Sequence, residues 1–148
     1  MIRILATALL ALSLTASAAF ATSMDDLVKR EGLYYKKFTD TPFTGLVDEG
    51  KTQGEFQKGV RNGTQWFYTE DGTLHEKYEM RNGSHHGLYV RYHSNGALET
   101  KGQYYRGLKQ GIWEQYYQSG QMKLTGMFQK SLKTGTFKAY HSNGQLQM

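Results

Sequence analysis

The histidines are the first residues whose chemistry could define a site. The chain has five histidines and no cysteine, so a metal centre would depend on imidazole and carboxylate ligands. His93 and His141 occupy the same position in two near-identical heptapeptides, YHSNGAL and YHSNGQL. His85 and His86 are adjacent in the turn RNGSHHG, where neighbouring side chains are poorly placed to share one ion. No third ligand accompanies either pair, so we predict hydrated surface histidines and no metal site.

Other residue types form no catalytic constellation. The chain has no Ser/His/Asp arrangement, no nucleophile elbow and no phosphate-binding loop. Turn chemistry explains Asp71 beside Glu70, and Lys36-Lys37 is typical of a solvated strand. Asp25-Asp26 is typical of the first turn of a helix. We therefore predict no enzyme activity, no catalytic residue and no cofactor.

A 24-residue repeat explains why the heptapeptide occurs twice. Two complete sets of glycines follow this period, and they are predicted to be structural: Gly63, Gly87, Gly111 and Gly135, then Gly72, Gly96, Gly120 and Gly144. Two further sets each have one substitution: Gly59, Gly83, Gly107 and Ser131, then Gly54, Tyr78, Gly102 and Gly126. A fixed period of this size indicates an array of similar units stacked on one another. Seventeen glycines among 148 residues make a helical unit unfavourable, at about 1 kcal/mol for each glycine relative to alanine.

Each unit is predicted to be a β-hairpin. Asp71, Asn95, Ser119 and Asn143 precede the second glycine set, and such pairs favour tight hairpin turns. The flanking segments are rich in Tyr, Phe, Trp and Thr, which favour strands. The predicted fold is therefore all-β: an elongated, single-layer antiparallel sheet of tandem 24-residue hairpins.

A two-residue turn at Asn95-Gly96 also predicts the register. Tyr89 then lies opposite Gly102, and one repeat later Trp113 lies opposite Gly126. We expect each ring to cover the backbone that the facing glycine leaves bare. In the first unit the pair is Gln65 and Tyr78, so the ring has changed strands as this complementarity requires.

The register divides the side chains between two faces. One face is apolar and carries Tyr89, Trp113, Phe137, Tyr104, Phe128, Leu98 and Met122. The other is polar and carries Glu99, Lys123, Lys77, Lys101 and Gln103. The periodic tyrosines fall on the polar face unless each strand contains a bulge, an alternative that the sequence leaves open.

Several aromatic residues lie outside the predicted buried set. Trp66, Tyr105 and Tyr117 differ from their equivalents in other repeats, so they either fill gaps or join the tyrosines in a contact surface. Tyr and Trp carry much of the binding energy at protein interfaces. The candidate binding surface is therefore Trp66, Tyr68, Tyr92, Tyr105, Tyr116, Tyr117 and Tyr140.

The chain is predicted to have three parts. Residues 1–21 resemble a secretory signal peptide, because Arg3 precedes a short apolar run that ends in an A-x-A cleavage pattern. An uncleaved anchor is the alternative. Residues 22–44 form an N-terminal cap, with Ser23 capping a helix over residues 24–30 before a leader strand. Residues 45–148 form the repeats, with a degenerate first hairpin and a last strand that is either frayed or a pairing edge.

Charge and export limit the classes of partner. The formal net charge of +5 falls by one when Arg3 leaves with the signal peptide, and basic residues are interspersed with acidic ones. This distribution predicts no nucleic-acid partner. The expected location is periplasmic or secreted, where a cationic protein can make peripheral contact with the envelope.

The repeat resembles a known family. The pattern G-x-W-x-x-Y-Y-x-x-G at residues 111–120 and its copies resemble the MORN repeat variant, which occurs in bacterial proteins labelled YwqK-like antitoxin components. The leader REGLYYKKFTDTPFTG resembles the segment that introduces such arrays, and the resemblance covers residues 26–148. It implies an elongated twisted sheet and a role in binding or scaffolding. A signal peptide does not suit the neutralisation of a cytoplasmic toxin, so antitoxin-like is taken as a family label only.

Two functions follow as expectations. The first is a non-catalytic exported repeat protein that mediates protein–protein interaction or scaffolding. Its partner is an unidentified protein, with self-association through the C-terminal edge strand as one option. The alternative is a module that binds envelope glycan or anionic lipid. Glycan and cation sites of this type gather several tryptophans per unit, and this chain has two in total, which favours the first function.

Overall fold

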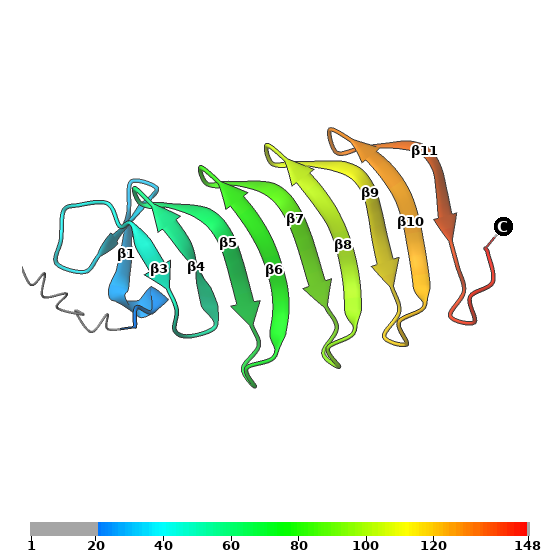
Figure 1. Cartoon of the computed structure of the whole chain (residues 1–148), viewed down its shortest axis with the longest axis horizontal. Helices are drawn as coiled ribbons and strands as arrows, with labels where there is room; N and C mark the ends of the chain where they lie inside the picture. Colours follow the sequence, from blue (N-terminus) through cyan, green and yellow to red (C-terminus); the bar gives the residue numbers. More distant parts are fainter. Residues whose placement is uncertain (1–20, 148) are drawn as a thin grey trace, which may run out of the picture.

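The computed structural model describes residues 21–147. Nine antiparallel strands, β3 to β11, lie side by side in chain order and form one long open sheet (Figure 1). A separate hairpin of β1 and β2 covers the N-terminal end of this sheet. The predicted all-β array of antiparallel hairpins is confirmed. The predicted signal peptide, apart from Ala21, lies outside the described residues.

Strands β5 to β11 each have eight or nine residues, as expected for a repeat, whereas β1 to β4 are shorter. No helix among residues 21–147 has the length and apolar character that crossing a membrane requires. The elements are η1 (Met24–Asp26), β1 (Leu27–Arg30), β2 (Leu33–Lys36), β3 (Gly45–Val47), β4 (Thr52–Gln57), β5 (Val60–Tyr68), β6 (Leu74–Arg81), β7 (Ser84–Tyr92), β8 (Leu98–Tyr105), β9 (Leu108–Tyr116), β10 (Met122–Gln129) and β11 (Leu132–Ala139).

The turns between hairpin units are two-residue turns, and we call them the upper turns after their position in Figure 1. They are Lys58-Gly59, Asn82-Gly83, Arg106-Gly107 and Lys130-Ser131, and both residues of every pair have positive φ. This is the backbone of a type I′ turn, whose twist matches that of the flanking strands. Ser131, which replaces the periodic glycine, keeps the same conformation at φ 66°.

The turns within hairpin units, here the lower turns, differ from the predicted two-residue type. His93 N–H donates to the Ala97 carbonyl at 2.8 Å and Gly96 N–H donates to the His93 carbonyl at 2.9 Å, so three residues connect the strands. Of these three residues, only Gly96 has positive φ. The Asn95 side chain instead accepts the Ala97 N–H at 3.1 Å, an Asx turn. The predicted turn type was wrong.

A one-residue bulge restores the predicted register beyond each lower turn. Arg91 lies opposite Thr100 but Tyr92 lies opposite Leu98, so Glu99 is the extra residue. The additional turn residue and the bulge offset each other, and Tyr89 lies opposite Gly102 as predicted. This bulge falls in the return strand, so the alternation of the tyrosine strand is unbroken between Tyr89 and Tyr92. Two residues predicted for the ring face lie directly opposite tyrosines instead: Leu98 opposite Tyr92 and Met122 opposite Tyr116.

A larger bulge occurs at every junction between units. Across β8 and β9, Lys101 pairs with Glu114 and Gln103 pairs with Gln110, so three residues of β9 face Gly102 alone. Gly111 lies in this bulge with φ 71°, a left-handed conformation that favours glycine. The equivalent Gly63, Gly87 and Gly135 also have positive φ, which explains the first periodic set.

The rings cover the glycines from a different strand than predicted. A methyl carbon added at Gly102 would meet the ring of Trp113, with Cε3 at 2.8 Å and two further ring atoms closer. At Gly126 the added carbon would meet Phe137. The covering ring therefore comes from the next unit across the junction, because the bulge there brings it over the preceding strand. Tyr89, the predicted cover, packs against Trp113 with ring centroids 5.5 Å apart.

The N-terminal cap begins as predicted and then departs from the prediction. The Ser23 hydroxyl accepts the Asp25 N–H at 3.1 Å, and the Asp26 carboxylate accepts the Ser23 N–H at 2.8 Å. The helix is only the single 3-10 turn η1, and the predicted continuation to residue 30 was wrong. The residues after it form β1 instead. Glu31 and Gly32 have positive φ and form the turn through which β1 pairs with β2. Leu27, the first residue of β1, is buried.

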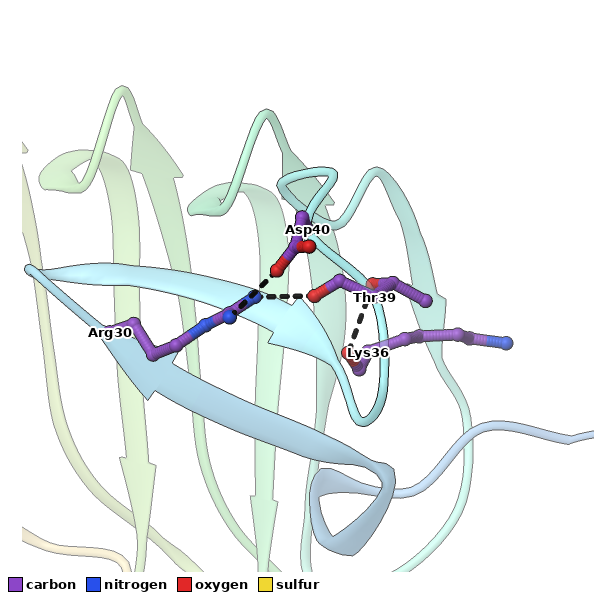
Figure 2. A network of polar contacts seen from close by, with 4 residues as sticks. All are labelled: Arg30, Lys36, Thr39 and Asp40. Carbon is purple, nitrogen blue, oxygen red and sulfur yellow. Dashed lines mark hydrogen bonds and ion pairs between the residues drawn. The ribbon is translucent and has the colours of Figure 1, made fainter.

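A small apolar core attaches the cap to the sheet. Leu27, Phe43, Val47 and Phe56 are buried together, with Met24 and Tyr34 packed against them. Figure 2 shows a polar network in the cap, in which Arg30 Nη1 lies 3.0 Å from Asp40 Oδ1 and Arg30 also donates to the Thr39 carbonyl. These bonds fasten the loop before β3 to β1, so the N-terminal end of the sheet is covered.

The opposite end of the sheet is open. Within residues 21–147, the outer side of β11 is bonded only near its end, where Gln147 N–H donates to the Ala139 carbonyl at 2.8 Å. Tyr140 and Leu146 form a single bridge beyond that bond. Most of the outer edge of β11 is therefore unpaired within the described residues, and the two alternatives of a frayed strand and a pairing edge both stay predictions.

Candidate binding surface

A continuous row of rings holds the ring face together. Centroid distances along the row are 4.8 Å from Tyr78 to His85, 4.9 Å from His85 to Tyr104 and 5.0 Å from Tyr104 to Trp113. The row continues through Phe128 to Phe137. Edge-to-face and tilted pairs at these distances stabilise each other beyond their buried area. This face therefore supplies the core of the thin sheet.

Titratable groups on the ring face are embedded in this packing. The Tyr89 hydroxyl donates to the Glu76 carboxylate, and Arg91 Nη2 lies 3.4 Å from the same carboxylate. Burial raises the pKa of Tyr89 and of Tyr104 and lowers the pKa of His85. In each case the uncharged form is favoured, as expected for groups whose main role is packing.

The opposite face, which we call the open face, carries a row of exposed apolar side chains among polar ones. Leu88, Ile112 and Met127 are 39%, 58% and 50% exposed, and Ile112 lies directly opposite Met127. Lys101 Nζ lies 2.8 Å from Glu114 Oε2 beside them. Hydrogen bonding between the two lowers the pKa of Glu114 and raises that of Lys101. The predicted polar face is thus partly apolar.

The periodic tyrosines of the candidate surface are half-buried near the lower turns. Tyr68, Tyr92 and Tyr116 lie opposite Leu74, Leu98 and Met122, and Tyr140 forms a bridge with Leu146. Each tyrosine has an apolar partner directly across the hairpin, which secures its position. Their rings remain partly accessible and are brought into one row by the repeat.

The three exceptional aromatics lie in different places. Trp66 is half-buried opposite Lys77 on the open face. The Tyr117 hydroxyl donates to the Tyr140 carbonyl of the next unit at 2.8 Å, as His93 Nε2 contacts the Tyr116 carbonyl at 2.9 Å one repeat earlier. Tyr105 is 53% exposed near an upper turn, with its ring 5.1 Å from that of His86. The structure therefore does not gather the candidates into one cluster.

Shallow recesses lie along the strands near the upper turns. One of about 370 Å³ is lined by Leu88, Lys101, Gly102, Gln103, Gln110, Ile112 and Glu114. Three others share His86, a residue expected from sequence only to be hydrated surface. The signal that could have identified it is periodic: Asn62, His86, Gln110 and Thr134 are equivalent, and only one is a histidine.

The described residues contain no group of three or more His, Asp or Glu side chains arranged to hold a metal. The open face offers an extended surface on which exposed apolar side chains lie beside an ion pair.

Comparisons with known proteins identify the repeat type. No curated protein matches the chain. Residues 86–104, 109–130 and 133–148 match the family described as MORN repeat variant, so three segments of the array are similar to the repeats of that family.

Proposed function

We propose that this chain is a non-catalytic exported repeat protein, periplasmic or secreted, that docks a protein partner across its open face. The observation that carries the proposal is the row of Leu88, Ile112 and Met127, each more than one-third exposed on an ordered sheet. Apolar side chains gathered in this way on a soluble surface mark interaction sites.

The surroundings of the row suit a protein rather than a small molecule. The recess between Leu88 and Ile112 is shallow and is flanked by the Lys101–Glu114 ion pair, so it resembles part of an interface with an apolar centre and a polar rim. The half-buried tyrosines extend the same surface toward the lower turns. A repeated surface of this kind suits an extended partner.

The test is partner capture with an altered open face. The double variant Leu88→Asp and Ile112→Asp should lose at least ten-fold in affinity for any protein that the unaltered chain retains from an envelope extract. Phe67→Asp is the matched control, because Phe67 is 39% exposed like Leu88 but alternation along β5 places it on the ring face. Equal retention by the double variant, with unchanged circular dichroism, would exclude the open face.

The β11 edge supports self-association as a second contact. Strands β9 and β10 each contain a Gly-x-aromatic motif, and the two motifs pair antiparallel, with Gly111 opposite Phe128 and Trp113 opposite Gly126. Strand β11 carries the same motif at residues 135–137. Two copies of the chain related by a two-fold axis through Thr136 would therefore pair their β11 strands in the same way. The cap covers the other end of the sheet, which disfavours an open filament.

Sedimentation velocity over a concentration series tests this edge. Thr136→Lys places like charges opposite each other at the two-fold axis and should weaken the dimer at least ten-fold, whereas Ser119→Lys in a lower turn should not. A monomer at every concentration, or a dimer indifferent to Thr136→Lys, would remove the self-association proposal.

One observation favours the alternative of anionic lipid or glycan. Three of the four upper turns between β4 and β11 begin with a basic residue, namely Lys58, Arg106 and Lys130, so one long edge of the ribbon is cationic. Cosedimentation with anionic vesicles or cell wall, lost above about one-half molar salt as screening shortens to a few ångström, would support this function. Binding only to neutral vesicles would contradict it.

A further inference from the structure

One upper turn lacks a hydrogen bond that its neighbours have. The N–H of Asn82 donates to Asn62 Oδ1 at 3.1 Å, and the N–H of Lys130 donates to Gln110 Oε1 at 3.2 Å. In each case a side chain of the preceding unit caps the first residue of the turn. The equivalent N–H of Arg106 has no such acceptor among residues 21–147, because the capping position is His86.

His86 adopts a different contact. The centroid of its ring lies 5.1 Å from that of the Tyr105 ring. The Arg106 guanidinium also lies over the Tyr105 ring, 5.3 Å from its centroid. Tyr105 is itself an exception, since the equivalent residues are Gln57, Arg81 and Gln129. Departures from the repeat therefore coincide at one place, between the upper turns of β6–β7 and β8–β9.

These exceptional residues line one recess. It has a volume of about 350 Å³ and is lined by Arg81, Asn82, Ser84, His86, Tyr105 and Arg106. Neither arginine forms an ion pair with another described residue. Two carboxylates, Glu55 and Glu79, line the adjoining recess that shares Arg81 and His86. Within the first recess all formal charge is positive.

We propose that this recess binds a phosphoryl group. Two guanidinium groups present forked donors that match phosphate oxygens, and the imidazole and the Ser84 hydroxyl add further donors. An oxygen of the anion would also fill the place that Asn62 and Gln110 occupy at the neighbouring turns and accept the free Arg106 N–H. This site stands independently of protein docking across the open face.

The experiment is a titration of the isotopically labelled full-length mature chain, followed by amide chemical shifts. Inorganic phosphate should give saturable shifts centred on the Arg106 amide. Glycerol 3-phosphate and vesicles of phosphatidic acid in phosphatidylcholine form two further arms. If the vesicles bind and both phosphate compounds compete with them, the recess can take the phosphoryl group of a lipid headgroup. If only the soluble compounds bind, the ligand is a free phosphate ester. Both results support the site.

The variants are taken from the repeat itself, so each keeps a residue already tolerated at its position. His86→Gln restores the acceptor found at Gln110, and Arg106→Asn copies Asn82. Each should weaken phosphate binding at least ten-fold. Lys58→Asn is the control, because it removes one positive charge from an equivalent turn outside the recess. Absence of saturation, or equal weakening by the control and His86→Gln, would overturn the site. Partner capture through the open face should be unchanged in His86→Gln, which separates the two proposals.

Discussion

Gly102→Ala tests how a single-layer sheet holds together. The added methyl carbon would lie 2.8 Å from Trp113 Cε3 and closer to two other ring atoms. Carbon atoms in contact are about 3.5–4.0 Å apart, so the ring has to withdraw by roughly 1 Å or more. Trp113 is only 6% exposed and packs against Tyr89, Tyr104 and Phe128, so it cannot withdraw without disturbing these contacts.

The expected cost follows from overpacking. Forcing a methyl group into a filled site destabilises a protein by about 1–3 kcal/mol. The backbone of Gly102 does not have the positive φ of most other glycines here, so alanine itself is compatible with the conformation. Reduced freedom of the unfolded chain returns about 0.4–1 kcal/mol. We therefore expect a net loss of about 1–2 kcal/mol in the free energy of unfolding, combining the overpacking cost and this gain.

A double-mutant cycle separates the ring from other causes. Trp113→Ala alone should cost about 3–5 kcal/mol, the usual cost of deleting a large buried ring. In that background Gly102→Ala should be neutral or slightly stabilising, because the methyl group enters the space that the ring has left. Urea unfolding is followed by far-UV circular dichroism, with slopes compared because repeat arrays can unfold in parts. An equal penalty for Gly102→Ala with and without the ring would refute the steric argument.

Three further predictions concern single side chains. Gln65→Ala should lower the free energy of unfolding by about 1–3 kcal/mol in urea melts, because this wholly buried amide donates to the Glu55 carbonyl and accepts from Arg61; a neutral effect would show that the two bonds contribute nothing. Tyr117→Phe should cost about 0.5–1.5 kcal/mol through the lost bond to the Tyr140 carbonyl, whereas Tyr105→Phe should be neutral, and equal effects in thermal melts would contradict the assigned contact. The pKa of His85 is lowered by burial from 6.5, so the unfolded chain binds more protons below that pH and stability should fall as the pH drops from about 6.5, a slope that should flatten in His85→Phe; an unchanged slope in urea midpoints would exclude His85 as its source.

Periodicity predicted most of the fold because the determinants are local. The 24-residue glycine pattern sets the strand length, and the pairing of Tyr89 with Gly102 followed from it. The turn type did not follow, because a three-residue turn with a bulge at Glu99 gives the same register as a two-residue turn without one. Residue spacing alone cannot distinguish a turn with these two compensating irregularities from a regular two-residue turn.

The remaining errors share a tertiary origin. Trp113 covers Gly102 because the junction bulge brings it there, and the bulge depends on pairing between units rather than on either hairpin. Residues 27–30 became β1 because burial of Leu27 against Phe43, Val47 and Phe56 outweighed a weak helical preference. The contacts of His86 are tertiary as well, because it lines a recess together with Tyr105 and Arg106 of the neighbouring hairpin.

Site-specific photo-crosslinking gives the most direct test that the open face is the docking surface. A photoreactive residue at Ile112 on the open face is compared with one at Phe67, which alternation along β5 places on the ring face. We expect a discrete partner adduct from Ile112 that Leu88→Asp abolishes, and no adduct from Phe67. Adducts of the same protein from both positions, or from Phe67 alone, would contradict it.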